Sequence, residues 1–194
     1  MSTHVDAKHL GSLQVHWKRH RTFPSLAKLA DVMGLSGAGS VFQAVSRLVE
    51  SGYLERIEGR IAPTKKFFSR RVLGTVRAGH PQEVSPSEDV ELMNADDVLI
   101  RHPERTSFAH VRGDSMNGVG LLDGDIVVVE HNTPARPGDV VVAVVDGATT
   151  VKTLVLEDGE FVLAPANAAF ETIRPGSSLE VLGVVVGSFR TMRR

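Results

Sequence analysis

The sequence predicts an α+β protein with two domains, a small helical domain followed by a mostly antiparallel, all-β domain. Apolar residues recur with helical spacing in the first fifty residues. From residue 106 onward, short apolar runs alternate with Pro-Gly and Asp-Gly pairs, which is typical of strands joined by tight turns. Charge divides the chain similarly: residues 1–77 hold 13 basic and 5 acidic side chains (+8), and residues 78–194 hold 9 and 18 (−9). We therefore expect two domains, residues 1–69 and 70–194, with different partners.

Three short helices are expected in the first domain. Leu10, Leu13 and Trp17 recur at the spacing of one helix face. Ser25 is a candidate N-cap for a second helix, and Gly34 is placed to end it. A third helix follows a short turn, and its expected apolar stripe consists of Ala38, Val41, Phe42, Val45, Leu48 and Val49.

A β-hairpin is expected after the third helix. The runs Tyr53–Ile57 and Arg60–Ala62 flank the turn pair Glu58-Gly59. Three helices followed by a hairpin in a basic segment predict a winged helix-turn-helix domain, whose recognition helix enters the major groove of DNA. Since periodicity alone also fits a small helical bundle, the basic charge is what favours DNA as the partner.

The polar face of the third helix supplies the expected base contacts, and the hairpin supplies contacts to the phosphate backbone. Glutamine can read adenine with two hydrogen bonds, and arginine can read guanine or hold a phosphate. The candidate DNA-binding residues are Ser40, Gln43, Arg47, Arg56 and Arg60.

Other classes of protein are disfavoured by composition. The absence of cysteine excludes disulfides and thiolate metal sites, and it fits a reducing cytoplasm, where we expect this protein to act. The apolar runs are too short to cross a membrane, and no signal peptide is evident. His80, His102, His110 and His131 lack metal-ligand spacing. We expect no metal, no cofactor and no membrane partner.

Two isolated residues of the β domain have the chemistry of a nucleophile and a base. Ser115 follows Gly113-Asp114 at the end of a strand-like run, and Lys152 lies inside another. A serine hydroxyl needs a base to remove its proton, and a lysine can be that base when its amine is neutral. Lys152 shares one strand face with Thr150 and Leu154, and burial of that face would lower its pKa. A turn serine and a solvated edge lysine are the alternative interpretation.

The segment between the domains contains the pair Ala78-Gly79. These are the smallest neighbouring residues in a stretch of bulky or charged side chains, and a nucleophile can approach their peptide bond closely. A plain linker is the alternative interpretation of this segment.

Together these features resemble the LexA, UmuD and phage-repressor family of self-cleaving proteins. The resemblance rests on Val111–Met116, on the 37-residue step from Ser115 to Lys152 and on the upstream Ala78-Gly79. Supporting stretches are Leu99–Pro103, Gly118–Asp125, Ala143–Gly147 and Leu163–Asn167. The resemblance implies that Ser115 is the nucleophile, Lys152 the general base and Ala78-Gly79 the scissile bond. It also implies an oxyanion hole of backbone amides near Asp114 and Ser115.

For function, the resemblance implies a repressor of DNA-damage (SOS) genes. It would bind double-stranded operator DNA as a homodimer, and a RecA filament on single-stranded DNA would stimulate its self-cleavage. Residues 35–42 depart from the usual LexA recognition residues, so we expect a different operator. One alternative is a UmuD-like self-processing subunit of an error-prone DNA polymerase, since Gly113-Asp114 before Ser115 is closer to UmuD. Another is a peptidase that cleaves other proteins.

Overall fold

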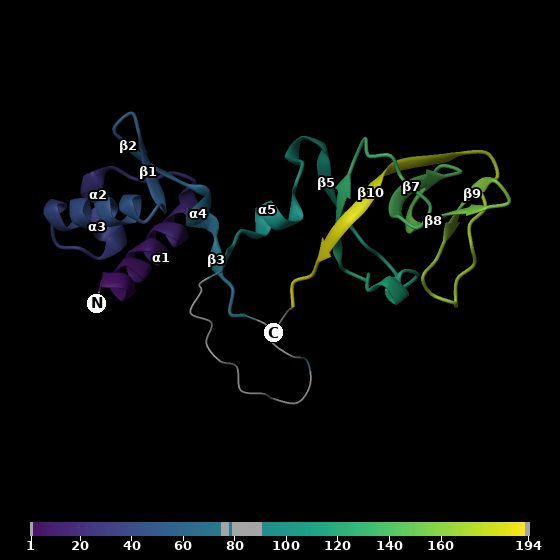
Figure 1. Ribbon diagram of the computed structural model, residues 1–194, viewed down its shortest axis with the longest axis horizontal. Coiled ribbons are helices and arrows are strands. Elements are labelled where there is room, and N and C mark those ends of the chain that lie inside the picture. Colours follow the sequence, from purple (N-terminus) through teal and green to yellow (C-terminus); the bar gives the residue numbers. More distant parts are fainter. Residues whose placement is uncertain (1, 75–77, 79–90, 193–194) are drawn as a thin grey trace. The chain divides into compact units, whose positions relative to one another are not determined.

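The chain forms two compact units, residues 1–95 and 96–194. The computed structural model describes residues 2–74, 78 and 91–192 (Figure 1). The predicted two-domain α+β architecture is confirmed, with helices in the first unit and an antiparallel sheet in the second. The units divide later than residue 69 because β3 (Arg70–Arg71) pairs with β4 (Leu92–Met93), which ties both ends of the expected hinge into the first unit. Where a DNA-binding part would end therefore stays a prediction.

Helices and a hairpin share one core in the first unit. In chain order its other elements are α1 (Ser2–His20), α2 (Leu26–Met33), α3 (Ala38–Glu50), β1 (Leu54–Ile57), β2 (Arg60–Pro63) and α4 (Lys65–Phe68). Figure 1 shows the hairpin β1–β2 projecting from the three longer helices. Buried side chains from every one of these elements except β2 pack together: Leu13, Leu29, Met33, Val41, Ala44, Val45, Leu48, Leu54 and Phe67. This core holds α3 and the hairpin in a fixed relation.

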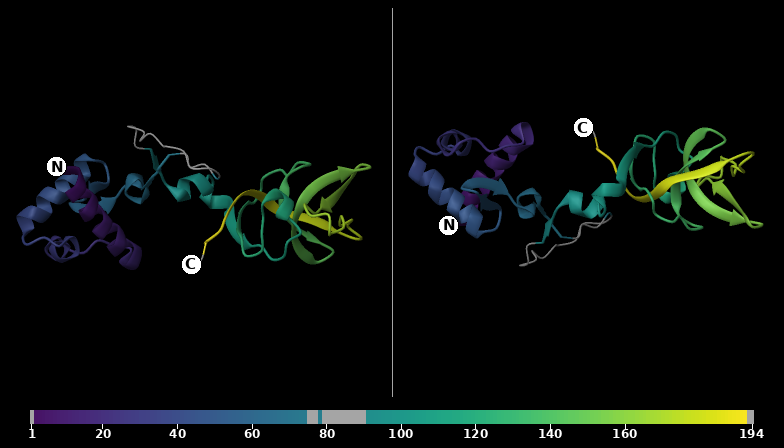
Figure 2. Two further views of the ribbon diagram at one scale, coloured as in Figure 1. Left: turned by 90° about the horizontal axis from the view of Figure 1, so that it is seen from below. Right: turned by 90° about the horizontal axis from the view of Figure 1, so that it is seen from above.

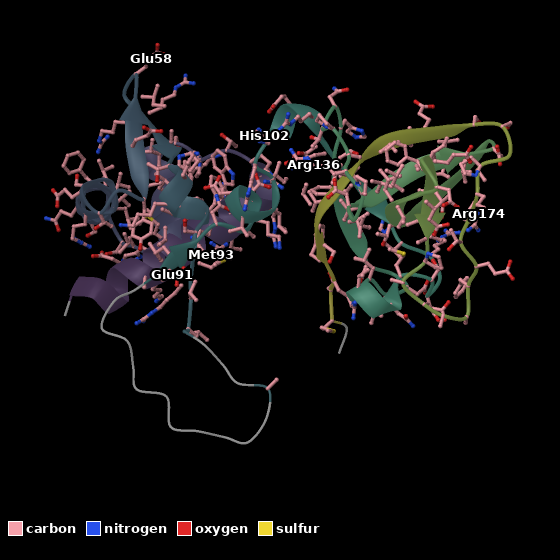
Figure 3. All side chains as sticks on the ribbon, turned by 45° about the vertical axis from the view of Figure 1, so that its right-hand side comes forward. Glu58, Glu91, Met93, His102, Arg136 and Arg174 are labelled. Atoms are coloured by element: carbon pink, nitrogen blue, oxygen red, sulfur yellow. The ribbon has the colours of Figure 1, made fainter. Side chains whose placement is uncertain are left out.

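The turn residues explain where these elements end. Gly34 adopts a left-handed conformation (φ 66°), and its N–H closes α2 on the carbonyls of Ala30 and Asp31. Ser25 is the N-cap residue as expected, but its side chain forms no capping hydrogen bond. Glu58 and Gly59 both have positive φ, which is the backbone of a two-residue hairpin turn. Glu58 lies at the tip of that hairpin (Figure 3).

The predicted apolar stripe of α3 is wrong at two positions. Val41, Val45 and Leu48 are buried, but Phe42 is 58% exposed and Ala38 is also exposed. Each residue of a helix turns about 100° from the last, so Phe42 lies well away from the face that Val41 and Val45 share. Ala44, which the prediction omitted, fills the core at that level. The exposed face of α3 therefore carries an aromatic ring.

An antiparallel sheet makes up most of the second unit, with strand order β5-β6-β10-β7-β8-β9. As expected from the alternating apolar runs and turn pairs after residue 106, the unit is built of consecutive strands: β5 (Thr106–His110), β6 (Ile126–Glu130), β7 (Val140–Val145), β8 (Ala148–Glu157), β9 (Glu160–Ala164) and β10 (Leu179–Phe189). The long β10 pairs with β6 through its second half and with β7 through its first, and both ladders contain register shifts. Such shifts bend a strand, and Figure 2 shows β10, in yellow, running along the curled sheet.

Short helical segments lie between the strands: α5 (Ala95–Leu99), η1 (Pro103–Arg105) and η2 (Asn117–Val119). Buried valines on β6 and β7 fill the core, whereas Val186 of β10 is 49% exposed. Within the described ranges, no helix is long and apolar enough to span a bilayer. The sheet thus provides the rigid support for the loop between β5 and β6.

Candidate active site

Ser115 and Lys152 lie side by side in the second unit. Ser115 sits in the loop between β5 and β6, just before η2, and Lys152 points inward from the middle of β8. Nζ of Lys152 lies 2.8 Å from Oγ of Ser115. The antiparallel pairing of β7 with β8 places Lys152 opposite the buried Val141, so the amine is carried by a fixed part of the sheet.

The oxygens around Nζ suit a neutral amine. Besides Ser115 Oγ, Nζ lies 3.1 Å from Oγ1 of Thr150 and 3.0 Å from the carbonyl oxygen of Val151. A neutral amine has two hydrogens and one lone pair, so it can donate to Thr150 and Val151 and accept from the Ser115 hydroxyl. Its lone pair then faces the proton that a general base must remove.

Burial favours the same protonation state. Lys152 is 8% exposed and its strand neighbour Leu154 is 3% exposed, so the predicted inward face is buried at this level, although Leu156 at its end is 49% exposed. Desolvation of the charged form lowers the pKa of the Lys152 amine below its ordinary value of 10.5. The three oxygens near Nζ are neutral groups, so none of them restores the charged form as a carboxylate would.

Hydrogen bonds on both sides hold the loop that carries Ser115. Val111 donates its N–H to the carbonyl of Asp125 (2.8 Å), and Gly124 donates to the carbonyl of Val111 (3.0 Å). Gly113, at φ 85°, donates its N–H to Oδ1 of Asp123 (2.7 Å). Asp125 is 1% exposed and is paired with Arg190 just beyond β10. The loop is therefore anchored to strands at both ends.

The backbone around Ser115 is also fixed by a segment that follows β9. Ala166 donates its N–H to the carbonyl oxygen of Ser115 (2.8 Å), and Asn167 donates from Nδ2 to the carbonyl oxygen of Asp114 (3.0 Å). Among the described residues, none accepts a hydrogen bond from the N–H of Asp114, Ser115 or Met116. Free N–H groups beside a nucleophile are what an oxyanion hole requires.

Ser115 and Lys152 line a cleft of about 330 Å³. Its walls come from the end of β5, the Ser115 loop, β7 and the first half of β8. They combine apolar and polar groups: Ala109, His110, Val111, Arg112, Gly113, Met116, Val142, Thr149, Thr150 and Val151. The cleft is open, so a peptide segment can reach the hydroxyl. Sequence reasoning gave no role to Thr150 or Asn167; the Thr-x-Lys spacing on one strand face was the available signal for Thr150.

The candidate DNA-binding residues lie on the first unit. Ser40 and Gln43 are exposed on α3, and Arg56 and Arg60 are exposed on the hairpin. The guanidinium carbon of Arg56 lies 5.5 Å from the ring centre of Phe42, so the exposed aromatic ring and the hairpin meet. Arg47 differs from the others, because its Nε donates to Oδ1 of Asp6 on α1 (2.9 Å). The roles of these five residues in DNA binding stay predictions.

The predicted scissile bond falls at the edge of the described residues. Ala78 is exposed, and Gly79 lies outside the described residues. Within the described residues, no three His, Cys, Asp or Glu side chains are grouped to hold a metal ion.

Comparison with known proteins supports this interpretation of the cleft. Residues 71–186 match the family described as Peptidase S24-like, a range that includes Ser115 and Lys152. The LexA repressor of Opitutus terrae is 34% identical over 179 residues, which cover 88% of each chain. The LexA repressor of Oleidesulfovibrio alaskensis is 31% identical over 86% of this chain and 85% of its own. The LexA repressor of Carboxydothermus hydrogenoformans is 28% identical over 97% of this chain and 96% of its own. These matches extend over both units.

Proposed function

The chain belongs to the LexA repressor family and carries its S24-like peptidase domain, and we propose that it represses DNA-damage genes until it cuts its own Ala78-Gly79 bond. The family and its peptidase domain support the function of a LexA-like repressor that cleaves itself as a serine peptidase. The observation that supports Ser115 and Lys152 as the catalytic pair is the 2.8 Å contact between a serine hydroxyl and a buried amine. Because the relatives that match most of the chain are repressors, a UmuD-like subunit of a DNA polymerase is the less favoured alternative.

Cleavage would proceed in two stages. Neutral Lys152 takes the proton of the Ser115 hydroxyl as Oγ attacks the carbonyl carbon of Ala78. The carbonyl oxygen becomes negative, and free backbone N–H groups near Asp114 and Ser115 stabilise it. Lys152 then gives its proton to the nitrogen of Gly79, the peptide bond breaks, and an ester joins Ser115 to Ala78. Water, deprotonated by Lys152, hydrolyses this ester and regenerates the hydroxyl.

The first unit would bind operator DNA as a winged helix-turn-helix domain. In this proposal α3 enters the major groove, where Ser40, Gln43 and Arg47 face base edges, while Arg56 and Arg60 of the hairpin bind phosphates. The exposure of Ser40, Gln43 and both hairpin arginines supports this. Arg47 must release Asp6 to read a base, so we propose that it serves mainly to hold α3 against α1 in the free protein.

Repression would depend on a homodimer. Two linked DNA-binding domains bind two half-sites with an avidity that each lacks alone, and cleavage between the domains abolishes that linkage. A RecA filament on single-stranded DNA would favour the conformation in which Ala78-Gly79 occupies the cleft. The filament thus acts as a co-protease and contributes no catalytic side chain.

One experiment tests the peptidase, the bond and the inducer together. The intact chain is incubated with RecA, single-stranded DNA and a nucleoside triphosphate, and the product masses are measured. We expect two fragments, residues 1–78 and 79–194, and none when RecA is omitted at neutral pH. An intact chain, or fragments that meet at another bond, would contradict the proposal. Gel shifts with promoter DNA test operator binding separately.

A further inference from the structure

The carbonyl oxygen of Asp114 accepts a hydrogen bond from the side chain of Asn167, 53 residues later in the chain. Nδ2 of Asn167 lies 3.0 Å from that oxygen, and Oδ1 of Asn167 accepts the N–H of Ala169 at 3.0 Å. Both ends of the amide are therefore engaged, which fixes its orientation. Ala166, the residue before Asn167, donates its N–H to the carbonyl oxygen of Ser115 (2.8 Å) and so holds the peptide group that follows.

These two contacts determine where two N–H groups point. In a trans peptide the C=O and the N–H lie in one rigid plane and point in opposite directions, so an anchored carbonyl fixes the direction of the N–H in the same plane. The Asp114 carbonyl shares its plane with the N–H of Ser115, and the Ser115 carbonyl shares its plane with the N–H of Met116. Within the described part of the chain both N–H groups lack an acceptor, and Ser115 and Met116 line the cleft.

Close packing keeps the segment against the Ser115 loop. Gly118 donates its N–H to the carbonyl oxygen of Ala166 at 2.8 Å. A Cβ added at Gly118 would lie 2.2 Å from that oxygen, a distance that the backbone cannot accept without moving. Only glycine lets the two backbones approach this closely at position 118.

We propose that Asn167 is a positioning residue of the peptidase, whose side-chain amide aims the N–H of Ser115 at the oxyanion formed during self-cleavage. The assignment rests on the proposed role of Ser115 as the nucleophile. The role of Asn167 differs from that of Lys152. Asn167 helps to stabilise the charge that develops on the substrate oxygen and contributes nothing to proton removal. In this proposal the segment that follows β9 positions the Ser115 loop for catalysis.

The test is self-cleavage without RecA, measured as a first-order rate from pH 7 to about pH 10.5, where lysine amines lose their proton. Asn167→Asp keeps the size of the side chain and the acceptor for Ala169, but it cannot donate to Asp114. Asn167→Ala removes the amide without adding charge. Ala168→Asp adds the same charge one exposed residue away and is the matched control.

We expect both Asn167 variants to lower the alkaline plateau rate about 10-fold or more, since one oxyanion donor is typically worth 100-fold or more. The pH midpoint should stay at the wild-type value, and Ala168→Asp should cleave within about twofold of wild type. Plateau rates of both Asn167 variants within twofold of wild type would overturn the proposal. A midpoint that moves toward that of ordinary lysine would also overturn it, because Asn167 would then hold the Lys152 pocket together.

A second pair of variants probes the same contact from the other side and covers the case in which the Asn167 variants fold poorly. Gly118→Ala should displace Ala166 and lower the plateau rate at an unchanged midpoint. Gly187→Ala is its control, because a Cβ there meets its nearest neighbours at 3.9 Å. Equal rates in the two glycine variants would count against the proposal. Fragments from the Ser115→Ala chain would instead refute the proposed nucleophile, so the two failures are distinguishable.

Discussion

Lys152 and Ser115 form a contact of 2.8 Å between amine and hydroxyl, although the first lies on a central part of a strand and the second in a loop. The contact is maintained by the sheet, which fixes Lys152, and by the anchored ends of the loop, which fix Ser115. Lys152 can accept a proton only when its amine is uncharged. The oxygens of Thr150 and Val151 near Nζ are neutral, so they do not hold the amine in its charged form as a carboxylate would.

Replacing either member of the pair should abolish self-cleavage. Ser115→Ala removes the nucleophile and Lys152→Ala removes the base, so we expect no fragments by mass spectrometry under conditions in which the wild type is cut. Operator binding in gel shifts should be unchanged. Ser107→Ala is a matched serine control, because Ser107 bonds to His131 on the sheet and lies outside the cleft. Fragments from either variant would show that the replaced residue is not the nucleophile or the base assigned here.

Self-cleavage without RecA should accelerate as the pH rises. Burial lowers the pKa of Lys152 below 10.5, so protonated amine predominates at low pH and neutral amine above the lowered pKa. The rate should therefore climb through that pKa, with a midpoint below 10.5, and level off above it. Rates are followed by electrophoresis between pH 7 and about pH 10.5, the ordinary range for lysine. A constant rate over this interval would argue against a lysine base.

The sequence predicts the elements better than it predicts their contacts. Strand bounds follow from local turn residues such as Asp158-Gly159, where both residues have positive φ and β9 begins at the next residue. Lys152 is predictable because a period of two places it on the face of Leu154. The bond from Asn167 to Asp114 joins residues 53 apart, and no local pattern encodes it. Phe42 was misplaced because hydrophobicity alone cannot show that an apolar residue faces outward.

Thr150 should set the reactivity of the amine. Thr150→Val removes one of the two oxygens to which neutral Nζ can donate, so the lone pair loses its orientation toward Ser115. A lost hydrogen bond of about 1 kcal/mol corresponds to a plateau rate lowered about 5-fold. Thr153→Val is the control, since Thr153 lies on the same strand as Lys152 but outside the lining of the cleft. Equal plateau rates for the two variants would show that Thr150 does not orient the amine.

Gln43 and Arg60 should affect operator binding in different ways. Gln43→Ala on α3 should weaken binding to the operator by about 1–3 kcal/mol while leaving non-specific binding unchanged, because a base contact is lost. Arg60→Ala on the hairpin should weaken binding to all sequences and reduce the slope of log affinity against log salt by about one. Gel shifts or fluorescence titrations at several salt concentrations measure both. Loss of non-specific binding in Gln43→Ala would place that residue at a phosphate.

The pair of Asp125 and Arg190 should stabilise the second unit in a pH-dependent way. A hydrogen bond from Arg190 is the largest cause, followed by the N–H of Leu122, and together they lower the pKa of Asp125 to about 2. A carboxyl whose pKa is lowered by folding contributes stability above its unfolded pKa of about 4, and this contribution is lost as the pH falls toward 2.

Arg190→Ala should therefore lower the unfolding temperature clearly at pH 7. The difference from wild type should shrink as the pH falls toward about 2, because Asp125 becomes progressively protonated in the wild type and in the variant. Arg174→Ala is the control, because its ion pair with Glu157 is exposed and should contribute little. Arg174 lies on the segment between β9 and β10 (Figure 3). Thermal unfolding of both variants at pH 7, 4 and 2 makes the comparison. A constant difference at all three pH values would mean that Arg190 stabilises by packing, because protonation of Asp125 would then have no effect on its contribution.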